Sequence, residues 1–243
     1  MKALLIDSSY DLKEEKTIVT LQGRLENGHS FISIHQFTPY CFIKQADKKK
    51  AEKYLIKFKV EEAKETTFLD QPVLKISNED YFQLNKLSEV LHKLEIDTYE
   101  ADIKPHTRFL IDHDLKLFID IEGDWEPGER VDRIYRNPII KAVNEVKQKV
   151  KMLALDTESD EQGNLFCIGL YGNNYQKCFF ITKNKLTNGV ACKDEVECLE
   201  KVQAEILKQD PDIITGWNII DFDMIYLNDL HKKHKIPFDW SRT

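Results

Sequence analysis

Several features that would assign a chain to a special class are missing from this sequence. No stretch approaches the roughly 20 consecutive apolar residues that span a bilayer, and the apolar run before Asp7 is too short for a signal peptide. The five cysteines are odd in number and show no C-x-x-C spacing, which argues against a disulfide framework and against a zinc site. We therefore expect reduced, buried thiols in a cytoplasmic protein that has no membrane partner.

An excess of basic residues is also missing. Lys and Arg number 35 against 42 Asp and Glu, which gives a net charge of −7. Because phosphate binding draws on clustered Lys and Arg, such a chain is not a generic nucleic-acid binder, and any contact with nucleic acid must be local or depend on other parts of the protein. The 243 residues, 42% of them hydrophobic and 32% charged, are enough for one large domain or two ordinary ones.

The first half of the chain, residues 1–150, predicts a small α+β domain. Two segments of alternating polarity flank Asn27-Gly28, a dipeptide that favours a type I′ hairpin turn. The polar stretch "NEVKQKVK" after Asn137-Pro138 marks the expected domain boundary. Other patterns predict strands at 40–44, 71–77, 116–123 and 130–137, and helices at 46–58 and 79–96.

The second half, residues 151–243, changes character. Its apolar patterns predict the order β-β-β-α-β-α, and the fourth strand follows a helical crossover, so it should lie parallel to the strand it joins. This is the order of a ribonuclease-H-like α/β core with a mixed sheet. The predicted strands are 152–158, 165–172, 176–182 and 212–218, and the predicted helices are 194–209 and 221–234.

Acidic residues stand at the ends of two of these strands. Asp156 and Glu158 lie two apart and share one face of their strand, and Asp223 opens the helix after the fourth strand. Functional crevices of open α/β sheets lie at the carboxyl ends of strands, so the three carboxylates are expected to converge on one pocket. Three such charges without Lys or Arg between them require divalent cations, and hard oxygen ligands suit Mg²⁺ or Mn²⁺. Two ions about 3.5–4 Å apart could then activate a water and stabilise a phosphoryl transition state.

Two acidic motifs carry a resemblance to a known family. "LALDTE" resembles the first exonuclease motif, D-x-E, of family B DNA polymerases, and "NIIDFD" resembles the second, N-x-x-x-F-D. The segment "TYEADIKPHTRFLID" is similar to the one that precedes the exonuclease domain in that family, and "GNLFCIGLYG" looks closest to its bacterial members. The resemblance covers most of the chain, and the specific signal is the pair of motifs about sixty residues apart, because D-x-E alone is uninformative.

The resemblance implies a function and roles for individual residues. It implies an N-terminal domain followed by a two-metal 3′–5′ proofreading exonuclease that acts on a single-stranded DNA 3′ end, with polymerisation on a primer-template carried by further domains. Asp156 and Glu158 would be catalytic metal ligands, and Asp223 would be a third. Asn218 and Phe222 would position the terminal nucleotide or support the site.

The family's third exonuclease motif, Y-x-x-x-D, is absent, and so is its H-x-x-x-D variant. The polymerase motif Y-G-D-T-D is absent as well. We therefore expect this chain to be part of a larger enzyme. Alone it should fold but show little exonuclease activity, because the metal site would lack its fourth carboxylate.

Other interpretations remain open at this point. The chain could be a non-catalytic DNA-binding or scaffolding domain, or a free-standing exonuclease of the same fold. His231 and His234 could bind a metal, although a solvated helix end is favoured. Trp217 could stack on a base or pack beside the strand end. Cys167 and Cys178 are expected to be small buried hydrophobes.

Overall fold

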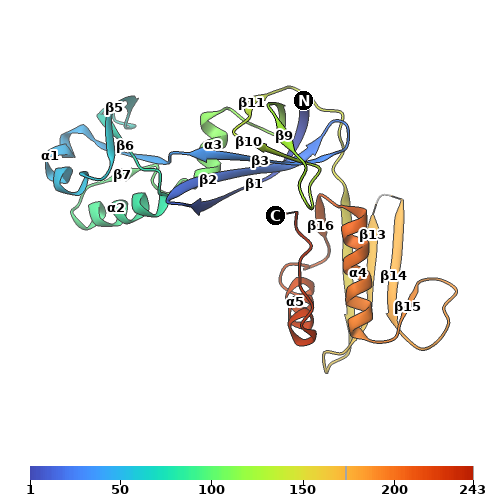
Figure 1. Cartoon of the computed structure of the whole chain (residues 1–243). Helices are drawn as coiled ribbons and strands as arrows, with labels where there is room; N and C mark the ends of the chain where they lie inside the picture. The colour runs from blue at the N-terminus through green and yellow to red at the C-terminus, as the bar shows by residue number, and fades with distance from the viewer. Residues whose placement is uncertain (173, 243) are drawn as a thin grey trace. The chain divides into compact units, whose positions relative to one another are not determined.

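The computed structural model describes residues 1–172 and 174–242. The chain divides into two compact units, Met1–Gln148 and Lys149–Thr243, and each has its own hydrophobic core (Figure 1). None of the helices among the described residues is long and apolar enough to cross a membrane.

The N-terminal unit contains a seven-stranded sheet. Its strand order is β11-β8-β1-β2-β3-β10-β9, and α3 packs against β1 and β2. The core on this sheet includes the fully buried Leu21, Phe31 and Ile119. The elements are β1 (Lys2–Lys13), β2 (Lys16–Leu25), β3 (Ser30–Phe37), α3 (Pro105–Asp112), β8 (Phe118–Glu122), β9 (Trp125–Glu126), β10 (Arg133–Arg136) and β11 (Ile139–Ala142).

A four-stranded sheet completes the N-terminal unit, in the order β5-β6-β4-β7. The helix α2 begins after Asp80, whose carboxylate accepts the N–H groups of Phe82 and Gln83, and it adds Leu84, Leu87 and Leu91 to the core. The elements are β4 (Tyr40–Lys44), α1 (Lys48–Ala51), β5 (Lys59–Thr66), β6 (Pro72–Ser77), α2 (Tyr81–Lys93) and β7 (Thr98–Tyr99).

Two details of this unit differ from the sequence predictions. The hairpin at Asn27-Gly28 forms, since β2 and β3 pair antiparallel, but only Gly28 has a positive φ, so the turn is not type I′. The helix predicted over 46–58 is one α-helical turn between the 3₁₀ turns Gln45–Asp47 and Glu52–Tyr54. No side chain caps any of these turns, and the buried residues of this stretch are Ala51 and Leu55, too short a stripe to hold a longer helix.

The C-terminal unit is one five-stranded mixed sheet with two helices, in the order β15-β14-β13-β12-β16. The strand β16 lies parallel to β12, as predicted, while β13 is antiparallel to both of its neighbours. The ribonuclease-H-like architecture expected for this half is therefore confirmed, with the short β15 added. The elements are β12 (Met152–Ser159), β13 (Leu165–Gly172), β14 (Tyr175–Ile181), β15 (Val190–Cys192), α4 (Glu195–Gln209), β16 (Ile213–Thr215) and α5 (Asp223–His234) (Figure 1).

Both helices of this unit bury apolar side chains against one face of the sheet, called here the core face. Asp194 caps α4 by accepting the N–H of Glu197, and Glu197 in turn accepts the N–H of Lys193. The core face contributes Leu153, Leu155, Ile168, Leu170 and Phe179, and the helices contribute Cys198, Leu199, Val202, Ile206, Leu227 and Leu230.

Candidate metal and substrate site

The strand β12 presents different chemistry on its two faces. Leu155 and Thr157 are buried on the core face, whereas Asp156 and Glu158 are exposed on the other, called here the open face. This alternation follows from the two-residue period of a strand. The structure therefore places the two carboxylates of the D-x-E motif side by side in solvent, as the sequence predicted.

The two carboxylates have no partners of their own on the open face. Neither Asp156 nor Glu158 makes a side-chain hydrogen bond or an ion pair among the residues that the structure describes. Across the ladder, Gly169 lies opposite Asp156, and Cys167 lies opposite Glu158. Two unpaired carboxylates on one face are unfavourable in isolation and favourable around a cation.

Two thiols lie close to these carboxylates. Cys167 and Cys178 are half-buried on neighbouring strands of the open face, so the expectation that they are small buried hydrophobes is wrong. Burial raises the pKa of the Cys167 thiol to about 12, and Cys178, Glu158 and Asp156 act in the same direction. The thiol stays neutral at physiological pH, which leaves the carboxylates as the charged, hard ligands of this face.

A hollow of ≈ 980 Å³ lies on the open face beside Asp156. Its floor is open at Gly169, where an added Cβ would meet nothing closer than the Asp156 carbonyl oxygen at 4.0 Å. Aromatic side chains line it, among them Tyr171, Phe180 and Trp217. Trp217 is 93% exposed, so its ring does not pack beside the strand end. Of the two predicted roles, the geometry therefore allows stacking of the ring on a base.

The turn that carries the second motif reaches β12 through a glycine. A Cβ on Gly216 would lie 2.4 Å from the Leu155 carbonyl oxygen, so only glycine permits this approach. Asn218 follows in the left-handed region, with φ 53°, and its carbonyl accepts the Phe222 N–H. Phe222 is half exposed and stacks on Tyr226. Asn218 and Phe222 thus lie at the surface on the turn that leads into α5.

Asp223 is buried beside β12. It is 2% exposed, and its Oδ1 accepts the Thr157 N–H at 3.0 Å and the Thr157 hydroxyl at 2.6 Å. Because one of these donors is the backbone N–H of Thr157, Asp223 sits at the edge of β12, beside the core-face residue Thr157. The described residues hold no group of three potential ligands close enough together to bind one metal ion. The convergence of all three carboxylates on one pocket therefore stays a prediction.

The two histidines of α5 are structural. His231 is fully buried, with Nδ1 3.2 Å from the Pro237 carbonyl and its ring against Phe238. His234 Nε2 lies 2.6 Å from Glu195, at the start of α4. His231 therefore packs against the segment that follows α5, and His234 joins α5 to α4, which replaces both the metal-site and the solvated-end interpretations.

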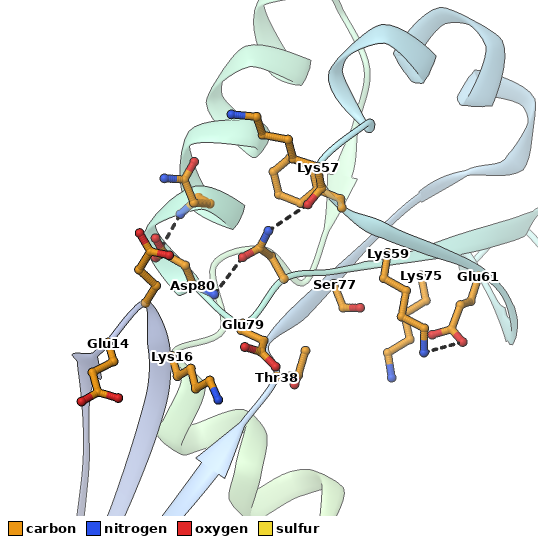
Figure 2. Close-up of a pocket in the computed structure, with 14 residues that line it drawn as sticks. Glu14, Lys16, Thr38, Lys57, Lys59, Glu61, Lys75, Ser77, Glu79 and Asp80 are labelled. Atoms are coloured by element: carbon orange, nitrogen blue, oxygen red, sulfur yellow. Dashed lines mark hydrogen bonds and ion pairs between the residues drawn. The ribbon is translucent and has the colours of Figure 1, made fainter.

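A second hollow, of ≈ 860 Å³, lies in the N-terminal unit. Figure 2 shows its walls, where lysines and carboxylates alternate; Lys59 forms an ion pair with Glu61 at 2.9 Å. Asn78 donates to the Lys57 carbonyl there, and Asp80 is occupied as the cap of α2. None of the residues predicted for chemistry lines this hollow.

The donor set at β12 fits a hard divalent cation. Mg²⁺ and similar ions are bound in proteins by one or two carboxylates together with substrate phosphates and waters. Asp156 and Glu158 supply two exposed carboxylates without partners among the described residues, and Asp156 also lines the hollow. The sequence analysis did not identify Thr157 or Gly169 as residues of the site. For Thr157 a signal was available, because the strand alternation places it between the two acids and on the core face.

A family model for the exonuclease domain of DNA polymerase family B matches residues 117–242, more than half of the chain. The chain belongs to DNA polymerase family B. It is 28% identical to DNA polymerase II of Escherichia coli (strain K12) over 184 residues, which is 72% of this chain and 22% of that protein. It is 26% identical to a DNA polymerase of Archaeoglobus fulgidus over 263 aligned residues, covering 98% of this chain and 31% of the relative.

A solved family B DNA polymerase from the hyperthermophilic archaeon Pyrobaculum calidifontis has the same fold. The TM-score is 0.81 at 21% identity, over 100% of this chain and 34% of that one. The family B chain described here thus spans between a fifth and about a third of the length of these relatives. The family's exonuclease domain implies dependence on a divalent metal.

Proposed function

We propose that residues 151–243 belong to the 3′–5′ proofreading exonuclease domain of a DNA-directed DNA polymerase, and that residues 1–150 belong to its N-terminal domain. The reaction is hydrolysis of the 3′-terminal phosphodiester of a single DNA strand with Mg²⁺ or Mn²⁺. No residue of this chain is assigned to polymerisation. The five free cysteines agree with a reducing compartment, and we place the protein in the cytoplasm.

One observation carries the proposal. Asp156 and Glu158 stand on the open face without partners among the described residues, and Asp156 lines a hollow large enough for a nucleotide, in a chain that belongs to DNA polymerase family B. The chain as a whole is acidic, so charge alone does not attract DNA to this face. Bound cations would reverse the local charge, because they are the largest charges in such a site.

In this proposal the chain's own residues bind and orient the strand. Asp156 and Glu158 would hold the divalent cations, which supply an activated water and charge stabilisation at the scissile phosphate. Trp217 would offer its exposed ring to the terminal base, and Phe222 would flank it. Asn218, at the surface of the same turn, would donate to the strand from its side-chain amide.

Asp223 would be the third carboxylate of the site, and it acts from the edge of β12 and not from the open face. Because Mg²⁺ keeps several of its waters in proteins, a carboxylate at the strand edge can act on the hydrated ion without lying beside the other two. Its Oδ1 is taken up by Thr157, and no hydrogen bond to Oδ2 occurs among the described residues. Oδ2 of Asp223 is therefore the oxygen that would contact the hydrated ion.

The proposal is tested by degradation of single strands labelled at one end, in the protein at its natural length. With Mn²⁺, a 5′-labelled strand should shorten stepwise while a 3′-labelled strand releases its label at once, and a chelator should stop both. Manganese titration followed by the electron paramagnetic resonance of free Mn²⁺ separates the alternatives. A scaffolding domain with relic carboxylates would bind DNA without binding Mn²⁺ or cleaving, and this result would overturn the proposal.

A further inference from the structure

Thr157 stands between the two open-face carboxylates in the sequence but serves a different partner. Its side chain is buried on the core face, where the hydroxyl donates to Asp223 Oδ1 at 2.6 Å and the backbone N–H donates to the same oxygen at 3.0 Å. Both bonds run to one oxygen of a charged group, the kind of hydrogen bond that is stronger than a neutral pair.

Among the described residues, no strand pairs with this edge of β12 at Thr157. The strand β16 pairs with β12 only from Met152 to Ala154, so the Thr157 N–H lies beyond the parallel ladder. A buried N–H without a partner is costly, and Asp223 supplies the missing acceptor. The Asp223 carboxylate thus accepts the free backbone N–H at the edge of β12, within the D-x-E motif. The same contact links the first turn of α5 to β12.

The same contact fixes Asp223. Asp223 is the first residue of α5, and Phe222 before it provides no side-chain cap. Among the described residues, the hydrogen bonds of the Asp223 carboxylate run to Thr157 and not to its own helix. Two donors on Oδ1 set the orientation of the carboxyl plane. They also leave Oδ2 as the oxygen without a protein donor among the described residues.

We infer that Thr157 is a positioning residue of the exonuclease site, which acts by holding the Asp223 carboxylate through its hydroxyl. The inference rests on the proposed function and deepens it. It gives the middle residue of the D-x-E motif a role of its own, which is to hold Asp223. The two flanking acids are exposed whatever residue stands between them. Any hydroxyl at this position that reaches Asp223 should serve, and a methyl group of the same size should not.

The chain offers a matched control for this test. Thr17, in the N-terminal unit, is equally buried, and its N–H and hydroxyl donate to the Glu79 carbonyl at 2.8 and 2.7 Å. Thr17→Val therefore removes a buried hydroxyl that donates to a carbonyl and also accepts the Tyr81 N–H at 3.1 Å, far in sequence from both acidic motifs. Thr157→Val removes the hydroxyl and keeps the shape, whereas Thr157→Ser keeps the hydroxyl.

The experiment measures kcat, KM for a single strand, and Mn²⁺ affinity of the protein at its natural length. Thr157→Val should lower kcat about tenfold or more, the effect expected for losing a hydrogen bond to a charged group, with KM nearly unchanged. Thr157→Ser should stay close to wild type, and Thr17→Val should lose stability without losing kcat. Thr157→Val added to Asp223→Ala should cause no further loss, since the partner is already gone.

Each other outcome contradicts a defined part of the account. Wild-type kcat in Thr157→Val, equal damage in Thr157→Ser, or losses that multiply in the double variant would overturn the positioning role alone. A wild-type protein that neither binds Mn²⁺ nor cleaves would overturn the proposed function, and the positioning role with it. If Thr157→Val does not fold, Thr157→Cys, with a much weaker donor of similar size, takes its place and should show the same loss of kcat.

Discussion

The two faces of the five-stranded sheet share one backbone and meet different physical requirements. On the core face, Leu153 and Leu155 lie against the helices and exclude water. On the open face, Asp156 and Glu158 stand in solvent and have no hydrogen-bond or ion-pair partner among the described residues. Burial of apolar side chains drives folding, whereas unpaired charges contribute little to it. Substitutions on the two faces should therefore separate stability from chemistry, and four predictions follow this division.

The largest effect is expected on the open face. In the protein at its natural length, Asp156→Ala with Glu158→Ala should lower 3′–5′ cleavage about a thousandfold or more, because the cations lose both exposed ligands. Polymerisation should be spared, since neither acid is assigned to it. The midpoint of thermal unfolding should stay the same or rise, because two like charges on one face are removed. Cleavage near the wild-type rate would contradict the metal role of these residues.

The core face should show the reverse. Leu155→Ala leaves a cavity against the helices, and such a change typically costs about 2–5 kcal/mol of unfolding free energy. Met152→Ala is the matched control on the same strand, since Met152 is half exposed on the open face. Its cost should stay within about 0.5 kcal/mol. Urea denaturation of both variants measures the two losses of unfolding free energy. Equal losses would contradict the division between the core face and the open face.

Gly169 sharpens the comparison from the floor of the hollow. The Cβ of Gly169→Val would meet only the Asp156 carbonyl oxygen, at 4.0 Å, and valine suits a strand better than glycine, so stability should change by less than about 1 kcal/mol. The new side chain would occupy the space beside Asp156 and hinder stacking of a base. We expect the affinity for a single strand, measured by fluorescence anisotropy, to fall roughly tenfold. Unchanged affinity would show that the strand does not enter this hollow.

The smallest effect concerns an ion pair on the core side. Lys177 on β14 donates to Glu205 on α4 at 2.7 Å, and this bond lowers the pKa of the Glu205 carboxyl. A carboxyl whose pKa is lower in the folded state stabilises above its unfolded pKa, and the contribution is lost as the pH falls through the folded value. As the pH falls, the unfolding free energy of Glu205→Gln should therefore decrease by about 1 kcal/mol less than that of the wild-type protein. Equal acid sensitivity in urea titrations of both proteins would contradict this assignment.

Much of the C-terminal unit followed from its sequence because its strands are regular. Alternation in "MLALDTE" and the helical spacing in residues 194–209 each reflect burial on one face, which a pattern of residues records directly. The parallel β16 followed from the handedness and length of crossovers. The short helix near Lys48 was over-predicted because lysines are good helix formers, while its length depended on tertiary packing that no local pattern shows.

The site was predictable in part for the same reason. A strand period places Asp156 and Glu158 together, and the structure agrees. The position of Asp223 depends on a turn that begins at Gly216, whose close approach to Leu155 is a three-dimensional fact. The left-handed Asn218 then sets where α5 begins. Thr157 became informative only once its buried hydroxyl was found against the Asp223 carboxylate.

The central claim is that the open face of β12 binds a divalent cation through Asp156 and Glu158. A crystal of the protein soaked in Mn²⁺, measured for anomalous scattering, tests it most directly. The account predicts an anomalous peak within about 2.0–2.6 Å of oxygens from both carboxylates, the range of hard-cation ligand bonds. A peak bound elsewhere, or carboxylates that remain without a metal at saturating Mn²⁺, would contradict it.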